Sequence, residues 1–417
     1  MAISRALHIG FRLKQTWAMT AFSLIFIWCG VDAQDFSVRV TNTDPLGLRN
    51  VVTAEDDLEL GFTNGIKGQF LYGIGVNVGY DSNLFLREDN PENEMTTSIA
   101  PWITYASDPE GGATFSMVAN YAPVARLLLN NSDLNGIDQS GDVRATLKGA
   151  KTQITTFVRY AELSGTDRLT SEFITGSQIN TGIQATYQIA PRTSLQGDLS
   201  HIKSDYGDSE GIGSDVYAVT FGGLWAATER LSVGPVLSYS HLQSDNIGSA
   251  DAWTLAMRAQ YLAGQRIRIS ASFGLEHAKY SDSAESNSTL QARGDLQASY
   301  AIDERWSWFN NLSYVTVPSP TEQGYVVNNL ALTSTLSRSL LRGSCGFGTD
   351  LNISSSEPVD SSNVDIENEN TIGLFVFYNR TLISDRVFLN TRTGYSMNHG
   401  QQDWSRFTIS ADVSMQF

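Results

Sequence analysis

Histidines are the first candidates for chemistry in this sequence of 417 residues. Beyond the N-terminal segment there are four of them, His201, His241, His277 and His399. A zinc site needs ligand atoms within ~4 Å of one another, whereas strands two positions apart in a sheet are separated by ~10 Å. Three of the four fall in segments that we expect to be such non-adjacent strands. We therefore predict neither a metal site nor a cofactor.

A hydrolytic site is the second possibility. Membrane-barrel phospholipases place a His and a Ser two residues apart on one strand, and none of these histidines has a Ser at that spacing. Barrel proteases gather acidic and histidine side chains over the barrel mouth. Here Asp205, Asp208 and Asp245 lie near His201 and His241 in the sequence. Acidic residues are common in such loops, so we predict no catalytic residue and no enzyme. A barrel hydrolase stays open as a lesser alternative.

Charged residues also stand between apolar ones in alternating segments. An arginine facing lipid costs ~2–4 kcal/mol at the bilayer midplane, and much less where it faces water. We therefore expect the charged positions to line a wet lumen. Arg258, Arg268 and Arg293 fall on consecutive expected strands and would form a basic arc that favours anionic solutes. The alternative is that they pair with Glu276 and Asp295. The lumen candidates are Arg144, Arg159, Arg258, Arg268, Glu276, Arg293, Asp295 and Arg392.

Strands must position these side chains, because apolar residues recur at every second position. From Phe70 to Tyr80 they alternate with small or polar residues, and residues 407–417 repeat the pattern. We count about eighteen such runs of ~10 residues, the length of a tilted membrane-crossing strand. The fold class predicted is all-β, a transmembrane antiparallel β-barrel of about 18 strands. Sixteen strands remain possible, because alternation is weakest in the fourth, fourteenth and fifteenth runs.

The connections and the aromatic residues support the same fold. Short connections alternate with long polar ones, as in outer-membrane barrels. A propeller also repeats every ~40 residues, but it would not keep an apolar outward face on every strand. Aromatic residues at the strand ends predict two interfacial girdles. The girdle candidates are Tyr80, Tyr239 and Tyr395 at the long-loop end, and Tyr187, Trp225, Tyr261, Tyr300 and Phe417 at the short-turn end.

The first residues read as a targeting segment. Arg5, Arg12 and Lys14 precede the mostly apolar run 18–29, and small residues follow before Gln34. This pattern predicts a cleaved secretory signal peptide. A lipoprotein signal using Cys29 is the alternative. We expect a signal peptide at 1–33, an N-terminal periplasmic extension at 34–66 and a single barrel domain at 67–417.

Composition limits the class of partner. Lys and Arg number 28 against 44 Asp and Glu, a net charge of −16, which argues against nucleic acid because that partner needs a basic surface. Charged residues make up only 17%, below the ~25% of a typical soluble domain. Once a signal peptide is removed, Cys345 is the sole cysteine, so no intrachain disulfide can form. The long loops are acidic, for example at Glu88, Asp89, Glu92 and Glu94, and Asp81 and Asn83 are a weak calcium pattern.

The first alternating hairpin carries a resemblance to a known family. The run Gly75-Val-Asn-Val-Gly-Tyr-Asp-Ser-Asn-Leu-Phe85, with Tyr121-Ala-Pro123 and the following Asp133 and Asn135, resembles a porin-like outer-membrane barrel family. Its members often lie in bacterial exopolysaccharide or exosortase-linked gene clusters. The resemblance covers about 60 residues and implies an outer-membrane pore or assembly component without catalytic residues.

These patterns together predict a porin-like channel of the outer membrane that passes a polar solute or an exopolysaccharide. A plugged barrel that serves as a structural or docking part of a polysaccharide export complex is the alternative. The expected partners are outer-membrane lipid and lipopolysaccharide, the export complex, and the barrel assembly machinery. That machinery would recognise the terminal strand ending at Phe417.

Overall fold

A computed structural model describes residues 68–107, 113–166, 173–206, 212–244, 248–280, 288–318, 325–358, 369–383, 386–400 and 403–417. The signal peptide and extension expected before residue 67 lie outside these ranges. The strands are β1 (Gln69–Asp81), β2 (Glu94–Ala106), β3 (Phe115–Leu128), β4 (Gly136–Lys148), β5 (Thr152–Thr166), β6 (Phe173–Ala190), β7 (Thr193–Tyr206), β8 (Ile212–Ala226), β9 (Leu231–Ser244), β10 (Gly248–Ala263), β11 (Ile267–Tyr280), β12 (Ser288–Ala301), β13 (Trp306–Pro318), β14 (Tyr325–Leu340), β15 (Gly343–Pro358), β16 (Glu369–Ile383), β17 (Val387–His399) and β18 (Trp404–Gln416). A 3-10 helix, η1, spans Ser132–Leu134.

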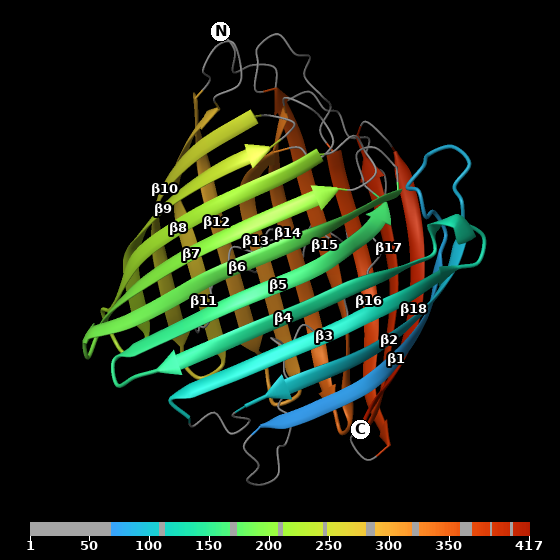
Figure 1. The fold of residues 1–417 in the computed structure, drawn as a ribbon, viewed down its shortest axis with the longest axis horizontal. Coiled ribbons are helices and arrows are strands. Elements are labelled where there is room, and N and C mark those ends of the chain that lie inside the picture. The colour runs from blue at the N-terminus through green and yellow to red at the C-terminus, as the bar shows by residue number, and fades with distance from the viewer. Residues whose placement is uncertain are drawn as a thin grey trace.

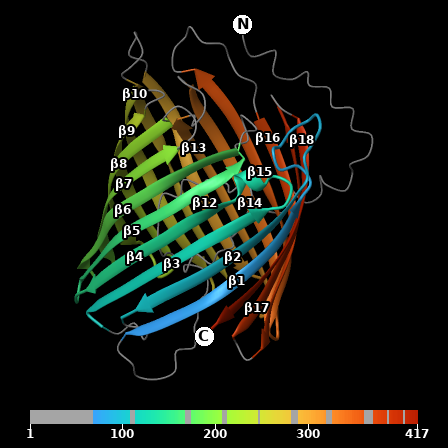
Figure 2. The ribbon, with the colours of Figure 1, turned by 45° about the vertical axis from the view of Figure 1, so that its right-hand side comes forward.

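The eighteen strands form one closed antiparallel barrel (Figures 1 and 2). Each strand pairs with the next along the chain, and β18 closes the wall against β1 from Gly73↔Gln416 to Asp81↔Thr408. Closure leaves no sheet edge, so every strand has a hydrogen-bonded neighbour on both sides. The predicted barrel is confirmed with eighteen strands. The alternative of sixteen is wrong, because β4, β14 and β15 are complete strands despite their weak alternation.

The register fixes the width of the barrel. Following paired residues once around the wall from β1 back to β1 advances the register by about 22 residues. With a strand spacing of ~4.7 Å and a rise of ~3.3 Å per residue, this stagger gives a strand tilt of ~40° and a backbone radius of ~18 Å. The strong tilt is visible in Figure 1.

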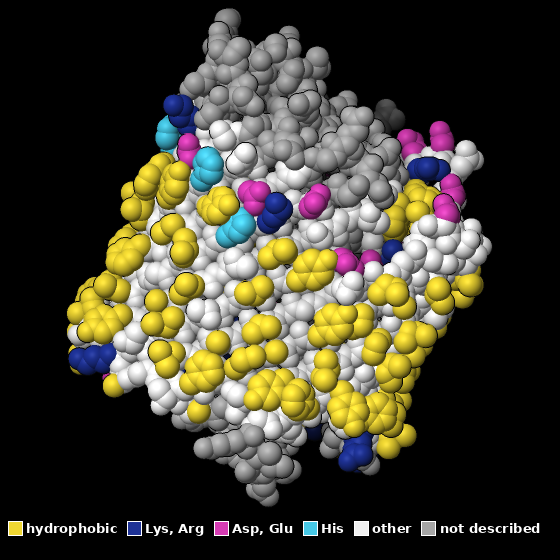
Figure 3. All heavy atoms as spheres, viewed as in Figure 1, with side chains coloured by type: hydrophobic (Ala, Val, Ile, Leu, Met, Phe, Trp, Pro, Cys, Tyr) yellow, Lys and Arg dark blue, Asp and Glu magenta, His cyan; other side chains and the backbone are white. Residues whose placement is uncertain are grey.

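The two faces of the wall differ sharply. On β1, Phe70 is 63% exposed on the outside while Leu71 is 7% exposed on the inside, and this alternation continues along the strand. Large apolar side chains are exposed on the outside of nearly every strand. In Figure 3 they cover the middle band of the visible face, with charged side chains gathered towards its two ends. The outer surface is thus apolar in the band where a water-soluble protein would be polar.

The two ends of the barrel differ in their connections. Short turns join β4 to β5, β6 to β7 and β14 to β15, and the C-terminus lies at this end (Figure 1). The last residue is tied to the first strand, because the Phe417 N–H donates to the Tyr72 carbonyl over 2.9 Å and the two rings stack. The longer connections lie at the opposite end, which we name the outer mouth. Within the ranges described, no helix has the length and apolar character needed to cross a bilayer.

Candidate channel wall and outer mouth

All eight lumen candidates lie on the inner face of the wall. Strand register assigns the faces, because residues paired across strands share a face and residues one apart along a strand do not. Met257 and Phe273 pair with each other and are exposed on the outside. Arg258, one residue from Met257, therefore faces inside, and so does Glu276, which lies three residues from Phe273 and pairs with Thr254. The same reasoning places Arg144, Arg159, Arg268, Arg293, Asp295 and Arg392 inside.

The predicted basic arc on β10–β12 is largely paired. Arg293 Nη1 lies 2.5 Å from Glu276 Oε2, and the same carboxylate oxygen accepts a hydrogen bond from Thr254 Oγ1 over 2.9 Å. Arg258 reaches across β9 and β8 and donates to Gln196 Oε1 over 2.6 Å. Of the two arrangements that the sequence left open, pairing is present for Arg293, whose partner is Glu276, while Arg258 is held by Gln196. Arg268 remains exposed on the inner face.

Two inner-wall arginines lie against aromatic rings. Arg159 stands 5.2 Å from the Phe157 ring centroid on β5, and Arg392 of β17 stands 4.1 Å from that of Phe375 on β16. Arg392 also reaches Asp350 on β15 over 3.8 Å. Phe157 lies two residues before Arg159 on the same strand, whereas the contact of Arg392 with Phe375 depends on the register between β16 and β17.

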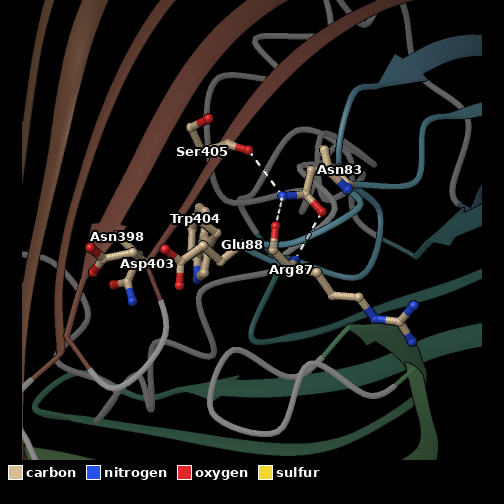
Figure 4. A pocket seen from close by; sticks show the side chains of 8 residues that line it. Asn83, Arg87, Glu88, Asn398, Asp403, Trp404 and Ser405 are labelled. Atoms are coloured by element: carbon tan, nitrogen blue, oxygen red, sulfur yellow. Dashed lines mark hydrogen bonds between the residues drawn. The ribbon is translucent and has the colours of Figure 1, made fainter.

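The Tyr-Asp-Ser-Asn motif closes the junction of the first and last strands at the outer mouth. The Asp81 carboxylate accepts from Arg406 of β18, over 2.8 Å from Nε, and both side chains are buried. The Asn83 amide nitrogen donates to the carbonyls of Arg87 over 2.8 Å and Ser405 over 3.1 Å, as Figure 4 shows. Its oxygen accepts from the Arg87 N–H over 3.0 Å. Both side chains thus have protein partners, and the calcium interpretation is not needed to explain them.

The β1–β2 loop reaches over the mouth towards β5. Leu84 and Leu86 are almost fully buried in it, and the Leu84 carbonyl accepts from Thr166 Oγ1 over 2.6 Å. Leu86 and Asn90 adopt positive φ angles of 53° and 55°, a conformation that is uncommon outside glycine and asparagine. Packing and hydrogen bonds therefore hold this loop in one conformation across the rim from β1 to β5.

Glu94 belongs to the same packed rim rather than to a solvated loop. It is 0% exposed and accepts from the backbone N–H groups of Leu129, Asn130 and Asn131, over 2.8, 2.9 and 3.0 Å. Glu94 is the first residue of β2 and pairs with Asp81, the last residue of β1. Burial would raise the pKa of this carboxyl, but the hydrogen bonds from Asn130, Asn131 and Leu129 together hold it below the ordinary value of 4.5.

A shallow cavity opens between the β1–β2 loop and the β17–β18 connection (Figure 4). Its volume is about 270 Å³. The residues around it are Asn83, Arg87, Glu88, Pro91, Asn398, Asp403, Trp404 and Ser405. Asn83 is committed to the loop backbone and Arg87 to Glu92 at 2.8 Å, so this cavity is a polar recess of the mouth.

The histidines lie on the outer face near the outer mouth. Three of them, His201, His241 and His399, each contact one carboxylate. His201 contacts Asp215 over 2.8 Å and stacks on Tyr217, and His241 contacts Asp251 over 3.0 Å. His399 contacts Asp403 over 2.9 Å. The partners of His201 and His241 are not the acidic residues near them in sequence. Asp205 lies four residues after His201 on β7, and Asp208 and Asp245 fall outside the described residues. No group of three metal-binding side chains occurs in the part of the chain that the structure describes.

The girdle candidates occupy both ends of the outer face. Tyr187, Trp225, Tyr261, Tyr395 and Phe417 are exposed. Tyr80, Tyr239 and Tyr300 are half-buried, and Tyr239 packs on Trp253 with ring centroids 4.7 Å apart. The interfacial role of these rings remains a prediction.

Solved structures of similar architecture are outer-membrane and transport proteins. OpdK of Pseudomonas aeruginosa, crystallised with vanillate, shares 10% identity at a TM-score of 0.49, over 84% of this chain and 99% of that chain. OccAB3 of Acinetobacter baumannii shares 10% at 0.48, over 84% and 100%. The FrpB iron transporter of Neisseria meningitidis shares 9% at 0.45, over 83% and 81%. No protein-family model and no curated protein sequence matches the chain. The likeness concerns the fold alone, and the barrel rests on this chain's own strand order and register.

Proposed function

We propose that this protein is an outer-membrane channel for small polar solutes. One observation carries the proposal: a closed barrel of eighteen strands combines an apolar, exposed outer band with an inner wall of charged and polar side chains. Barrels of 16–18 strands are wide enough to leave an aqueous channel. An apolar band around a closed barrel matches a bilayer core, in which every backbone polar group must be paired within the protein.

The wall would act by replacing part of the hydration of a passing solute. Hydroxyl, amide and charged side chains on the inner face offer hydrogen bonds along the path, and paired arginines such as Arg293 keep their charge without a large desolvation cost. Selectivity would then follow from the width of the lumen and from side chains that solutes can reach, the exposed Arg268 and the half-buried Arg392 among them. A more specific version of the proposal is that the solute is an exopolysaccharide chain.

Liposome swelling tests the proposal directly. Purified, refolded protein is placed in liposomes loaded with an impermeant polymer, and swelling is followed in isosmotic solutions of sugars of increasing size. We expect rapid swelling with monosaccharides and slower swelling with larger oligosaccharides. Swelling no faster than that of protein-free liposomes, from protein with a β-type circular dichroism spectrum, would overturn the proposal.

A barrel closed at its mouth is the second candidate, and the packed rim favours it. The β1–β2 loop crosses from β1 to β5 with buried leucines and a fixed hydrogen bond to Thr166. If this loop blocks the path, the protein would serve as a docking barrel for an export complex. Deleting residues 85–91 would then turn a silent barrel into one that permits swelling, whereas a channel is permeable before the deletion.

A further inference from the structure

The inner wall over β15–β17 carries a flat aromatic surface. The rings of Phe375 and Phe377 occupy the space in which a Cβ would stand on Gly348 and Gly346 of the neighbouring strand. Each ring therefore lies along the wall instead of projecting from it. Their centroids are 6.5 Å apart and their planes differ by 34°. Two adjacent rings that lie along the inner wall form a surface on which a ring-shaped solute can rest.

A planar cation covers one of these rings. Arg392 extends from β17 over β16, with its guanidinium carbon 4.1 Å from the Phe375 centroid, and ends 3.8 Å from Asp350 Oδ2 on β15. Stacking on an aromatic ring holds a guanidinium in place while leaving its N–H donors at the edges. Thr333 Oγ1 donates to Asp350 Oδ1 over 2.8 Å and fixes that carboxylate. Phe377, the Arg392 guanidinium on Phe375, and Asp350 thus follow one another along the wall, because Phe377 pairs with Gly346 and Asp350 with Gly373. They offer an apolar face, a cation and a hydrogen-bond acceptor in that order.

This pair is longer and has a more exposed carboxylate than Arg293–Glu276, in which Arg293 is 31% exposed but lies 2.5 Å from a Glu276 that is 8% exposed. The side chains of Arg392 and Asp350 are 34% and 48% exposed, and the 3.8 Å separation is longer than a hydrogen bond. Arg406 and Asp81 are 7% and 8% exposed, and Arg126 is 4% exposed beside Asp138 at 2.6 Å. Tight, buried pairs stabilise the wall. An exposed, loose pair leaves both groups accessible to a solute.

We propose that Phe377, Arg392 and Asp350 form a subsite for acidic sugars, that is, pyranose rings bearing a carboxylate. The carboxylate of one ring would pair with Arg392 while its apolar C–H face rests on Phe377, and hydroxyls of the adjacent ring would donate to Asp350. Asn390, held to Asp412 over 3.2 Å on the neighbouring strands, adds a further polar group beyond Arg392. The inference rests on the proposed function, because it needs the inner face to be reached by solutes.

Other ring-bearing acids satisfy the site less well. Benzoate can pair its carboxylate with Arg392, but it has no hydroxyl to donate to Asp350. Phenylalanine could place its ammonium at Asp350, but it has no hydroxyl for the amide and hydroxyl groups of the wall. Galacturonate, benzoate and phenylalanine therefore separate the three chemistries.

Binding is measured by isothermal titration calorimetry on the full-length protein in detergent, with digalacturonate as the probe and benzoate and phenylalanine for comparison. We expect digalacturonate to bind at least tenfold more tightly than either, and Arg392→Gln to lose at least tenfold in affinity. Phe377→Ala should weaken binding to a smaller extent. The matched control is Arg338→Gln, which removes an arginine stacked on Trp306 on the outer face and should leave affinity unchanged.

The outcomes separate the subsite from the channel. Equal losses in Arg392→Gln and Arg338→Gln, tighter binding of benzoate or phenylalanine, or no binding heat from folded protein would overturn the subsite. Permeability is followed in the same preparation by liposome swelling. A permeable barrel without Arg392-dependent binding refutes the subsite and keeps the channel. An impermeable barrel that binds digalacturonate through Arg392 keeps the subsite and refutes the channel.

Discussion

The ion pair between Asp81 and Arg406 should determine how firmly the barrel closes at its outer mouth. The two residues lie on the first and last strands and are 8% and 7% exposed at their side chains. Asp81→Asn would remove the charge of Asp81 from the buried Arg406, and breaking a buried pair in this way costs about 3–5 kcal/mol. Because β1 and β18 are joined from Gly73↔Gln416 to Asp81↔Thr408 only, we expect the loss to fall on closure of this junction.

A double-mutant cycle measures that coupling. Urea unfolding of the wild type, Asp81→Asn, Arg406→Gln and the double variant is followed by tryptophan fluorescence in lipid vesicles, to which Trp404 contributes beside the junction. The double variant should lose less than the sum of the single losses by about 1–3 kcal/mol. His399→Asn is the control, because its pair with Asp403 is 85% and 48% exposed and such pairs contribute about 1 kcal/mol or less. Single variants within 1 kcal/mol of the wild type, or strictly additive losses, would refute the role given to this pair.

Three further predictions concern the rim and the wall. Glu94, whose pKa is lowered in the folded protein, should stabilise the β3–β4 loop fully above pH 4.5 and progressively less as the pH falls below it. The protection factor of the Asn130 amide, its exchange rate relative to that of an unstructured peptide at the same pH, should fall on acidification, and an unchanged protection factor would contradict this. Phe273→Arg on the outer face should lose about 2–4 kcal/mol in vesicle unfolding, whereas Ser272→Arg on the inner face should lose much less. Gly73→Ala should destabilise the β1–β18 junction, because its Cβ would overlap the Met415 carbonyl; a wild-type unfolding midpoint would show that the backbone relaxes there.

The fold could be predicted from the sequence because the alternation of apolar and polar residues is a local property of each strand. Every second residue from Phe70 to Tyr80 is apolar, and a wall between lipid and water requires this period of two. The same alternation placed Arg258, Arg293 and Arg392 on the inner face before the barrel was known. The ambiguity over sixteen or eighteen strands arose where small and polar residues occupy both faces, as on β4.

The contacts of the mouth could not be predicted in the same way. Asp81 and Arg406 meet only because the first strand pairs with the last, and their separation in the chain is 325 residues. Glu94 appeared as one more acidic loop residue, since its partners are backbone N–H groups that a sequence does not distinguish. The aromatic support of Arg392 depends on a register that places Phe375 against Gly348. A glycine opposite an aromatic residue in adjacent alternating runs is the signal that could have indicated it.

Single-channel conductance in a planar bilayer tests the central claim most directly. The purified, refolded full-length protein is added to one side at low concentration, and current is recorded at several voltages. An aqueous lumen within an eighteen-strand wall predicts discrete insertion steps with a steady, ohmic current. Protein that is folded by its β-type circular dichroism and inserted in the bilayer, yet passes no current at any voltage, would contradict the channel.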